Sequence, residues 1–519
     1  MKDNAETVKL NKDDSFIAVN RDNLKKILFD NRDTEYGKKY GFGNIDTAEE
    51  YIKRVPLSRF SDYEEAVDRM MSGQDGVLTS YPVYDYAVTS GSAGKRKVFP
   101  VTYEALERYG TQIDDRLIRL AGDRKNVRLF VSRLRKNNDD DVIKKGPKLL
   151  SELYYAYQSE HGLFPSEQFA GGSDLTFVSA KDYDYLYAKL WTAFSYKDIL
   201  TVEGLFLYDL LIFFNQMKKF WKTILSDMEA GSIPDTVKLT PKLKEALIRI
   251  IPDKGRIEEL KNEFSRGMNG IAKRIFPELE LISGIGSLPS MTEEIMLKTY
   301  TGDIPVSHFC FVSSECHMGV PVEDESFDYR LLSDSAFFEF LSDDENSRNT
   351  VLPGEVIEGR DYEIVITTFS GLYRYATGDV VTVTGFSGEN PLVRFKCRRD
   401  LVLNVAGEKT DEYTLDSVMR DLAAETVMSI SGYLARADIS ELPGKYEIMI
   451  CTERKYKQDG LSSIFDRLMI KYNKDYEDLR NMGSIGMPAV TLCGEEEYRR
   501  SRIYFGMDLG HLKPVHILL

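Results

Sequence analysis

The order of strand-like and helix-like stretches is the feature that most limits the folds open to this chain. Residues 181–275 have a mostly helical pattern, whereas strand-like stretches separated by Gly-rich turns begin near Glu278. Beyond about Asn404, short helices and strands alternate. Because 519 residues are too many for one simple core, more than one domain is expected. We predict an α/β fold with a large N-terminal domain of mixed sheets and helices, residues 1–400, and a small C-terminal α+β domain, residues 401–519.

Local periodicity gives the expected elements. Residues 14–75 should be helices with short breaks, and Thr102 should cap the helix that follows it. The expected strands are Tyr84–Thr89, Val98–Val101, Leu279–Ile282, Val306–Val312, Tyr362–Thr368, Asp379–Val383, Leu392–Cys397, Tyr446–Cys451 and Ala489–Cys493. The other expected helices are Tyr103–Leu120, Glu412–Glu425 and Ser462–Tyr472.

Charge and composition narrow the range of partners. The net charge of -15 argues against a nucleic-acid partner, which needs a basic surface. The most apolar window, Leu205–Phe214, is short and contains Asp209, so we expect a buried helix and no membrane span. The polar stretch Met1–Phe16 lacks the apolar core of a signal peptide, and the five cysteines form no CxxC pair. A cytoplasmic monomer is therefore expected.

A segment rich in Gly, Ser and Lys, Thr89–Lys97, lies between two expected strands. Its glycines would let backbone N–H groups approach an anion, its hydroxyls would add donors, and its lysines would supply charge. It is not a Walker A loop, because Lys95 is followed by Arg96 where that motif needs Ser or Thr. Taken alone, such a segment is as often a plain hairpin loop as a phosphate-binding loop. The residues suited to phosphate are Ser90, Gly91, Ser92, Gly94, Lys95 and Lys97.

Two further segments place reactive side chains at strand ends. Phe311-Val312-Ser313-Ser314-Glu315 offers an aromatic ring, hydroxyls and a carboxylate, which suit adenine stacking, phosphate contact and Mg²⁺ binding. In Gly378-Asp379, an Asp after a Gly at a strand start can accept hydrogen bonds from two ribose hydroxyls. Each has a plainer alternative, with Glu315 as a surface carboxylate and Asp379 as a turn residue.

The last segment of interest, Arg398–Glu412, crosses the expected domain boundary. It combines a basic pair, a flexible Gly407 and Lys409 just before a helix. A hinge between the two domains is expected at residues 400–410.

In this order and spacing, the four segments resemble the adenylate-forming superfamily of acyl-CoA synthetases, luciferases and peptide-synthetase adenylation domains. The phosphate loop of that superfamily reads Ser/Thr-Ser-Gly-Ser/Thr-Thr-Gly-x-Pro-Lys, and Thr89–Lys97 matches it except at Ala93 and Arg96. Ala93 removes one phosphate donor, which would tune affinity and not abolish binding. The YGxTE, GD and RxDxxIKxxG motifs are matched by Phe311–Glu315, Gly378-Asp379 and Arg398–Gly407.

The residues within these segments resemble one branch in particular. Ser313-Ser314-Glu315-Cys316, the segment Tyr373–Phe386 and Glu408-Lys409-Thr410-Asp411-Glu412 are similar to the acyl acid–amido synthetases first known as auxin-responsive proteins of plants. The ending Gly510–Pro514 resembles their bacterial relatives. The resemblance covers about residue 85 to the C-terminus.

The resemblance implies a role for each matched position. Phe311 would stack on adenine, Ser314 would reach the α-phosphate, and Asp379 would bind the ribose. Glu315 would bind Mg²⁺ and Asp400 would be the hinge. Lys513 also fits a solvated terminal lysine. The implied ATP-binding residues are Ser90, Gly91, Ser92, Gly94, Lys97, Phe311, Ser314, Asp379 and Arg398, and the implied catalytic residues are Lys409 and Lys513.

The implied activity is ATP- and Mg²⁺-dependent activation of a small carboxylic acid to acyl-AMP, followed by transfer to an amino acid or another amine. A ligase that uses coenzyme A as acceptor is the alternative, and Ser313–Cys316 with Glu408–Glu412 favours the amide-forming branch. A non-catalytic nucleotide-binding protein of the same fold is a third possibility. The retention of Lys97, Glu315, Asp379 and Lys409 argues against it.

Overall fold

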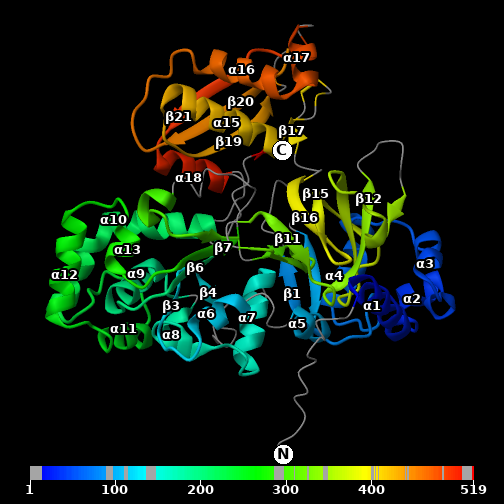
Figure 1. The fold of residues 1–519 in the computed structure, drawn as a ribbon, viewed down its shortest axis with the longest axis horizontal. Coiled ribbons are helices and arrows are strands. Elements are labelled where there is room, and N and C mark those ends of the chain that lie inside the picture. Colours follow the sequence, from blue (N-terminus) through cyan, green and yellow to red (C-terminus); the bar gives the residue numbers. More distant parts are fainter. Residues whose placement is uncertain are drawn as a thin grey trace, which may run out of the picture.

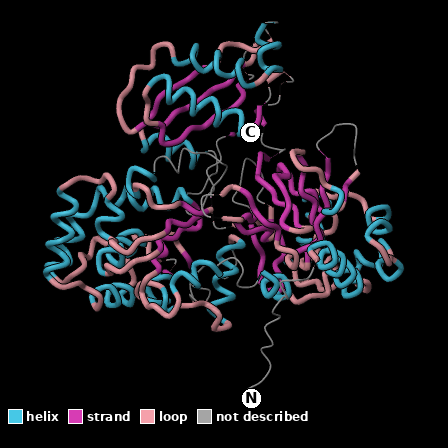
Figure 2. The backbone as a smooth tube through the Cα atoms, viewed as in Figure 1, coloured by secondary structure: helices cyan, strands magenta, loops and turns pink. Residues whose placement is uncertain are grey.

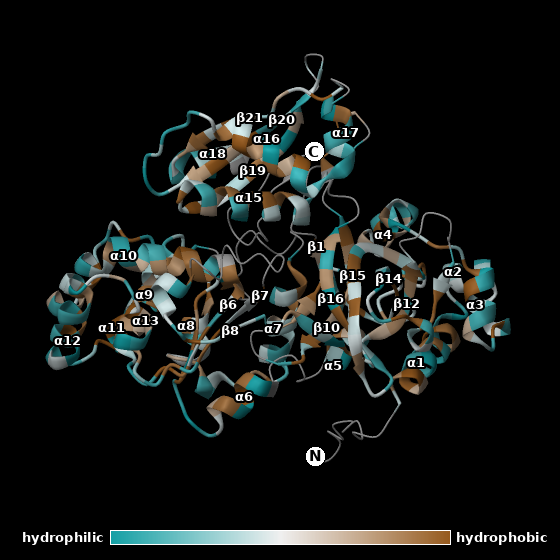
Figure 3. Ribbon diagram, turned by 45° about the horizontal axis from the view of Figure 1, so that its top comes forward, coloured by the Kyte–Doolittle hydropathy of each residue, from teal (hydrophilic) through white to brown (hydrophobic). Residues whose placement is uncertain are grey.

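The protein folds into three parts, each with its own apolar core (Figure 1). The computed structural model describes residues 15–88, 97–109, 115–135, 148–179, 181–285, 297–308, 310–323, 326–342, 349–398, 402–403, 405–406, 408, 410–438, 440, 443–481, 484–504 and 517–518. In all three parts, helices lie beside the strands (Figure 2). Hydrophobic residues gather on the inner strands, and hydrophilic ones on peripheral helices such as α3 and α12 (Figure 3).

The first part begins with a helical segment that packs on a large sheet. The side chain of Asn20 donates to the carbonyl of Phe338 at 3.1 Å and accepts from its N–H at 2.7 Å, which ties the first helix to the sheet. Thr102 accepts from the N–H of Ala105 at 3.2 Å, so the predicted cap is confirmed. The elements are α1 (Phe16–Asn31), α2 (Glu35–Tyr40), α3 (Ala48–Arg54), α4 (Glu64–Met71), β1 (Val83–Val88), β2 (Val98–Thr102), α5 (Tyr103–Tyr109), α6 (Asp115–Ala121) and α7 (Leu150–Glu160).

In the described part of the chain, the large sheet has eight antiparallel strands in the order β13-β12-β14-β15-β16-β11-β10-β9. Its long central strands, β14 and β15, are buried over most of their length and carry buried polar residues such as Glu363 and Asp379 among the apolar ones. The strands are β9 (Phe311–Val312), β10 (His317–Pro321), β11 (Asp328–Leu331), β12 (Ala336–Ser342), β13 (Thr350–Val351), β14 (Asp361–Thr368), β15 (Tyr375–Ser387) and β16 (Asn390–Arg398).

The second part is a parallel sheet, in the order β3-β6-β7-β8, surrounded by helices (Figure 1). Its elements are β3 (Arg128–Phe130), α8 (Gly172–Thr176), α9 (Tyr185–Ser195), β6 (Thr201–Phe206), α10 (Leu207–Ala230), α11 (Pro241–Ile248), α12 (Lys254–Ser265), α13 (Ile271–Ile275), β7 (Leu281–Ile285) and β8 (Val306–Ser307). A short parallel pair, β4 (Leu134–Arg135) with β5 (Phe177–Val178), lies beside it.

Two expectations from the sequence are corrected in this region. Residues 181–275, which we expected to be mostly helical, contain the strand β6. All six residues of β6 are buried, because a central parallel strand is covered on both faces. The single strand expected over Val306–Val312 is two strands in two different sheets: β8 pairs with β7, and β9 pairs with β10. The apolar residues on either side of His308 therefore belong to different cores.

Lys189 on α9 is a buried amine within the second core. Its ammonium nitrogen donates to the carbonyls of Leu175 and Thr176 at 3.0 and 2.8 Å, at the end of α8. Burial lowers the pKa of Lys189 to about 7. A lysine in the unfolded chain titrates near 10.4, so the unfolded state holds more protons between these two values. The contribution of Lys189 to stability should therefore rise as the pH is raised from 7 towards 10.5.

We expect the free energy of unfolding to gain about 2 kcal/mol from Lys189 between pH 7 and pH 9. Lys189→Met should remove this gain, as measured by urea unfolding at the two pH values. Lys273→Met is the matched control, because Lys273 also donates to a carbonyl, that of Leu279 at 2.9 Å, but is exposed. The same pH dependence in Lys189→Met as in the unsubstituted protein would contradict the expectation.

The third part is the C-terminal sheet β21-β20-β19-β22 with α15 and α16 packed together over it. The predicted helices and strands at 412–425, 446–451, 462–472 and 489–493 are confirmed, but the long strand β19 was missed. Position 432 of that strand is a glycine because Tyr498 packs directly against it. A Cβ at Gly432 would lie only 2.7 Å from the Tyr498 hydroxyl. The elements are β17 (Val402–Leu403), β18 (Thr410–Asp411), α15 (Glu412–Thr426), β19 (Ile430–Asp438), β20 (Lys445–Thr452), α16 (Leu461–Tyr472), α17 (Lys474–Asn481), β21 (Ala489–Cys493), α18 (Glu495–Tyr504) and β22 (Ile517–Leu518).

Ion pairs connect the C-terminal part to α10 of the second part. Lys218 lies 3.8 Å from Glu453, and Lys219 lies 3.0 Å from Glu495. The C-terminal core takes its residues from Leu403 onward. We propose residue 400 as the boundary between a large domain, which holds both larger cores, and the small C-terminal domain. No helix in the described ranges combines the length and apolar character needed to cross a membrane.

Candidate nucleotide-binding site

The large sheet and the β1–β2 hairpin meet where the sequence motifs lie. The hydroxyl of Ser314 donates to the carbonyl of Val88 at 2.9 Å. Val88 ends β1, directly before the segment rich in Gly, Ser and Lys, and Lys97 lies half-buried at the start of β2. The strand end that carries Ser314 is therefore joined to the base of the expected phosphate loop.

Glu315 is buried beside Ser314. Its Oε1 accepts a hydrogen bond at 3.1 Å from the hydroxyl of Tyr375, the first residue of β15. Its Oε2 is also buried, and none of the residues that the structure describes donates to it. Burial, together with the Glu315 carboxylate, raises the pKa of Tyr375, so this hydroxyl keeps its proton and remains a donor. A buried carboxylate oxygen without a donor is suited to bind a cation.

Asp379 and Arg398 are direct neighbours across β15 and β16. The Asp379 side chain is only 4% exposed, and Arg398 Nε donates to its Oδ1 at 2.7 Å. The carboxylates of Asp379 and Glu315 both raise the pKa of Arg398, so the guanidinium stays charged. Glu315, Tyr375, Asp379 and Arg398 thus form one connected polar cluster at the edge of the apolar core.

Phe311 lies on β9 within the same sheet. Its ring packs against those of Tyr329 and Phe395, with centroids 5.5 and 6.1 Å away. Stacking of Phe311 on adenine stays a prediction. The other residues predicted from the sequence, which lie outside the described residues, are Ser90, Gly91, Ser92, Gly94, Lys95, Asp400, Lys409 and Lys513.

Sequence reasoning gave no role to three residues of this region. Tyr375 was part of a recognised motif, but nothing in the motif indicated that its hydroxyl reaches Glu315. His317 is buried and stacks on Tyr109 with ring centroids 4.5 Å apart, and among the described residues neither of its ring nitrogens has a hydrogen-bond partner. Burial lowers its pKa to about 3, so the imidazole is neutral at physiological pH. Arg374 has a positive φ of 46° and is buried among acceptors that come from distant segments.

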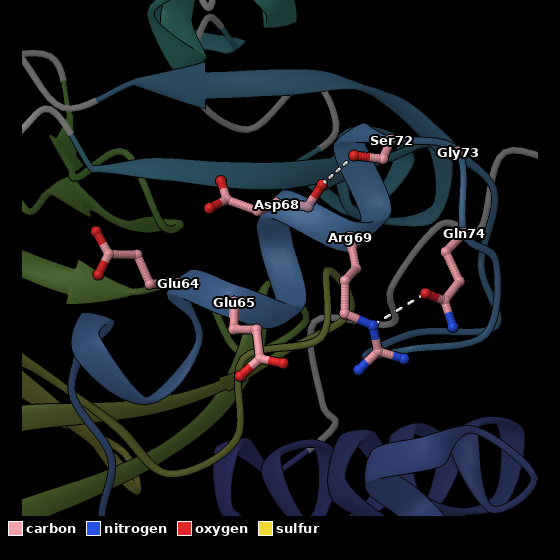
Figure 4. A pocket seen from close by; sticks show the side chains of 7 residues that line it. All are labelled: Glu64, Glu65, Asp68, Arg69, Ser72, Gly73 and Gln74. Carbon is pink, nitrogen blue, oxygen red and sulfur yellow. Dashed lines mark hydrogen bonds between the residues drawn. The ribbon is translucent and has the colours of Figure 1, made fainter.

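A surface pocket of about 640 Å³ lies on α4, apart from this cluster (Figure 4). Its three carboxylates, on Glu64, Glu65 and Asp68, would repel the phosphates of a nucleotide. Its one arginine, Arg69, is paired with Glu35 at 2.5 Å. The residues that line the pocket are Glu64, Glu65, Asp68, Arg69, Ser72, Gly73 and Gln74, and none of them was predicted from the motifs.

Comparison with family models identifies the chain along most of its length. Residues 11–306 match the GH3 family N-terminal domain, residues 329–398 the GH3 family central domain, and residues 413–518 the GH3 family C-terminal domain. The cluster described above therefore draws its residues from the central domain and from the segment directly before it.

Relatives and solved structures agree with this match. The chain is 26% identical over 477 residues to the indole-3-acetic acid-amido synthetase GH3.6 of Arabidopsis thaliana, covering 85% of this chain and 77% of that protein. The solved structure of the AtGH3.15 acyl acid amido synthetase in complex with 2,4-DB superposes with a TM-score of 0.82 at 21% identity, over 97% of this chain and 91% of the other. A 2-hydroxyisobutyryl-CoA ligase in the postadenylation state has a TM-score of 0.51 at 10% identity, over 99% and 94% of the two chains, and shares the fold. The chain belongs to the GH3 family.

Proposed function

We propose that this protein is an acyl acid–amido synthetase, which uses ATP to activate a carboxylic acid as acyl-AMP and then transfers the acyl group to an amine such as an amino acid. The observation that carries the proposal is the buried cluster of Glu315, Asp379 and Arg398 beside the base of the loop that precedes Lys97. Membership of the GH3 family supports it, because relatives such as GH3.6 are named for amido synthetase activity.

Each residue of the cluster has a task in this reaction. Asp379 accepts hydrogen bonds from the ribose hydroxyls, with Arg398 holding its carboxylate in place. Ser314 contacts the α-phosphate. In the phosphate loop, Ser90, Ser92 and Lys97 bind the phosphates, and Gly91 and Gly94 allow the backbone to approach them. Phe311 borders the adenine.

The Oε2 atom of Glu315 fits Mg²⁺, because it is a buried carboxylate oxygen that accepts no hydrogen bond from the described part of the chain. No group of three or more His, Cys, Asp or Glu residues among the described ranges could hold a metal by itself. Mg²⁺ at nucleotide sites commonly takes one or two carboxylates and completes its shell with substrate phosphates and water, so a single Glu suffices. When bound, Mg²⁺ would neutralise phosphate charge.

The chemistry needs charge neutralisation and alignment more than a nucleophilic side chain. A carboxylate is a poor electrophile, and joining it to AMP turns one of its oxygens into part of a good leaving group. The protein must hold the carboxylate in line with the α-phosphate and then admit the amine. We propose that the C-terminal domain turns about Asp400 between these steps and presents Lys409 in one and Lys513 in the other.

The cellular setting follows from the same proposal. The five cysteines are all buried and form no disulfide, as in a reducing compartment. A cytoplasmic monomer would meet ATP, Mg²⁺, the acid and the amino acid there.

A coenzyme A ligase remains the competing function, because the 2-hydroxyisobutyryl-CoA ligase shares the fold. The test is to incubate the protein with ATP, Mg²⁺, a carboxylic acid that supports pyrophosphate exchange, and an equimolar mixture of amino acids and coenzyme A. We expect mass spectrometry to find the amide as the acyl product. Thioester without amide would reject the amido synthetase assignment in favour of the thiol ligase.

A further inference from the structure

Asp379 lies in a bulge of β15. Glu363 of β14 pairs with Val380, and Val365 pairs with Ala376, so three residues of β15 face the single residue Ile364. We call these three residues, Thr377–Asp379, the bulge segment. Bulges of this kind bend a strand and redirect a side chain, and they are common next to active sites.

The bulge segment is held by three hydrogen bonds. The Thr377 hydroxyl donates to the carbonyl of Ile364 at 2.8 Å and accepts from the N–H of Asp379 at 3.1 Å. The N–H of Gly378 donates to Oε1 of Glu363 at 2.9 Å. Gly378 has a φ of +83°, which other residues rarely adopt, so the segment has this shape only with its glycine in place.

Two residues of β14, Ile364 and Glu363, accept hydrogen bonds from the bulge segment, and of these two only Glu363 is charged. The side chain of Glu363 is fully buried. Arg59 donates two hydrogen bonds to the Glu363 carboxylate, from Nη1 to Oε1 at 2.5 Å and from Nη2 to Oε2 at 3.1 Å. The same guanidinium donates to the carbonyl of Ala376 at 3.0 Å. Arg59 therefore contacts the strand on one side of the bulge segment while Glu363 holds its centre.

We propose that Glu363 is a positioning residue for the nucleotide: with Arg59, it fixes the backbone of the bulge segment so that the Asp379 carboxylate meets the ribose hydroxyls. The inference rests on the proposed function, in which Asp379 binds the ribose. Arg398 holds the Asp379 side chain from β16, and Glu363 holds the N–H of the preceding Gly378 from β14, so the segment that carries the carboxylate is fixed from both neighbouring strands. Glu363 itself does not touch the substrate.

A purely structural role and a positioning role differ in what they do to ribose recognition. The readout is the ratio of kcat/KM for ATP to kcat/KM for 2′,3′-dideoxy-ATP in acid-dependent pyrophosphate exchange. Loss of fold or of active protein lowers both values together and leaves the ratio unchanged. Displacement of the Asp379 carboxylate lowers the value for ATP alone, because only ATP has the hydroxyls that Asp379 binds.

Glu363→Ala should lower this ratio about ten-fold, mainly through the KM for ATP, and Glu363→Gln about three-fold, because the glutamine oxygen can still accept from the N–H of Gly378. Asp361→Asn is the matched control: Asp361 lies on the same strand and pairs with Lys396 at 2.6 Å, but makes no contact with the bulge segment. It should keep the ratio of the unsubstituted protein.

Asp379→Ala separates this inference from the assignment on which it rests. If it removes the preference for ATP while Glu363→Ala and Glu363→Gln both keep it, Asp379 binds the ribose and Glu363 is no positioning residue. If Asp379→Ala itself keeps the preference, the ribose role is wrong and the inference falls with it. Should Glu363→Ala fail to fold, the ratio measured with Glu363→Gln decides.

Discussion

Alanine in place of Asp379 should raise the KM for ATP by about 100-fold, because a ribose held by one carboxylate loses two charge-assisted hydrogen bonds. The substitution also leaves the charged Arg398 without its 2.7 Å partner. The measurement is pyrophosphate exchange as a function of ATP concentration at a fixed, saturating concentration of acid. The kcat reached at saturating ATP should change much less than the KM.

The control for this prediction is the thermal unfolding of the same variant, which should show that the protein is still folded at the temperature of the assay. Asp379→Asn should give a smaller rise in KM, because an amide keeps one acceptor oxygen. Unchanged ATP kinetics in a folded Asp379→Ala protein would show that Asp379 is only a turn residue.

The second large effect concerns stability and the pair Arg374–Glu339. Arg374 donates to Glu339 at 2.9–3.1 Å and to the carbonyls of Ile52 and Val55 at 2.7 and 2.8 Å. The two side chains are only 6% and 1% exposed. Glu339→Ala leaves an arginine charge buried and unpaired, so the free energy of unfolding should fall by about 4 kcal/mol.

Urea unfolding of matched variants tests this expectation. Asp328→Ala breaks the ion pair between Asp328 and Arg394 of the same sheet, whose length is 2.8 Å. Because the Arg394 side chain is half exposed, the free energy of unfolding should fall by only about 0.5 kcal/mol. The double variant Arg374→Met with Glu339→Leu should recover part of the loss, since it removes both charges. A cost for Glu339→Ala no larger than that for Asp328→Ala would be incompatible with a structural role for the buried pair.

Local patterns in the sequence predicted much of the fold. The strands at 362–368 and 446–451 were predictable because they are short apolar runs between turn signals. Strand β19 was missed, because a glycine within a strand is unfavourable on its own and Gly432 is accommodated by Tyr498, which packs against it from a distant segment. The break between β8 and β9 was also missed, because an apolar run does not indicate which of two sheets each half joins.

The candidate site, like the fold, could be predicted from the sequence only in part. Glu315, Asp379 and Arg398 lie within recognisable motifs, and the structure brings these three together. The residues that support them could not be predicted, because their partners are distant in the sequence. Arg59 reaches Glu363 across 304 positions, and no local spacing indicates such a contact. Arg374 likewise donates to the carbonyl of Ile52, 322 positions away, and to the hydroxyl of Thr350.

The measurement that tests the central claim most directly is the identity of the nucleotide products. The protein should be incubated with ATP, Mg²⁺, a panel of carboxylic acids and an amino acid mixture, and the nucleotides separated by chromatography. Adenylation should give AMP and pyrophosphate in equal amounts, formed only when an acid is present. ADP and phosphate as the acid-dependent products would contradict adenylation and the proposed roles of Asp379 and Glu315 with it.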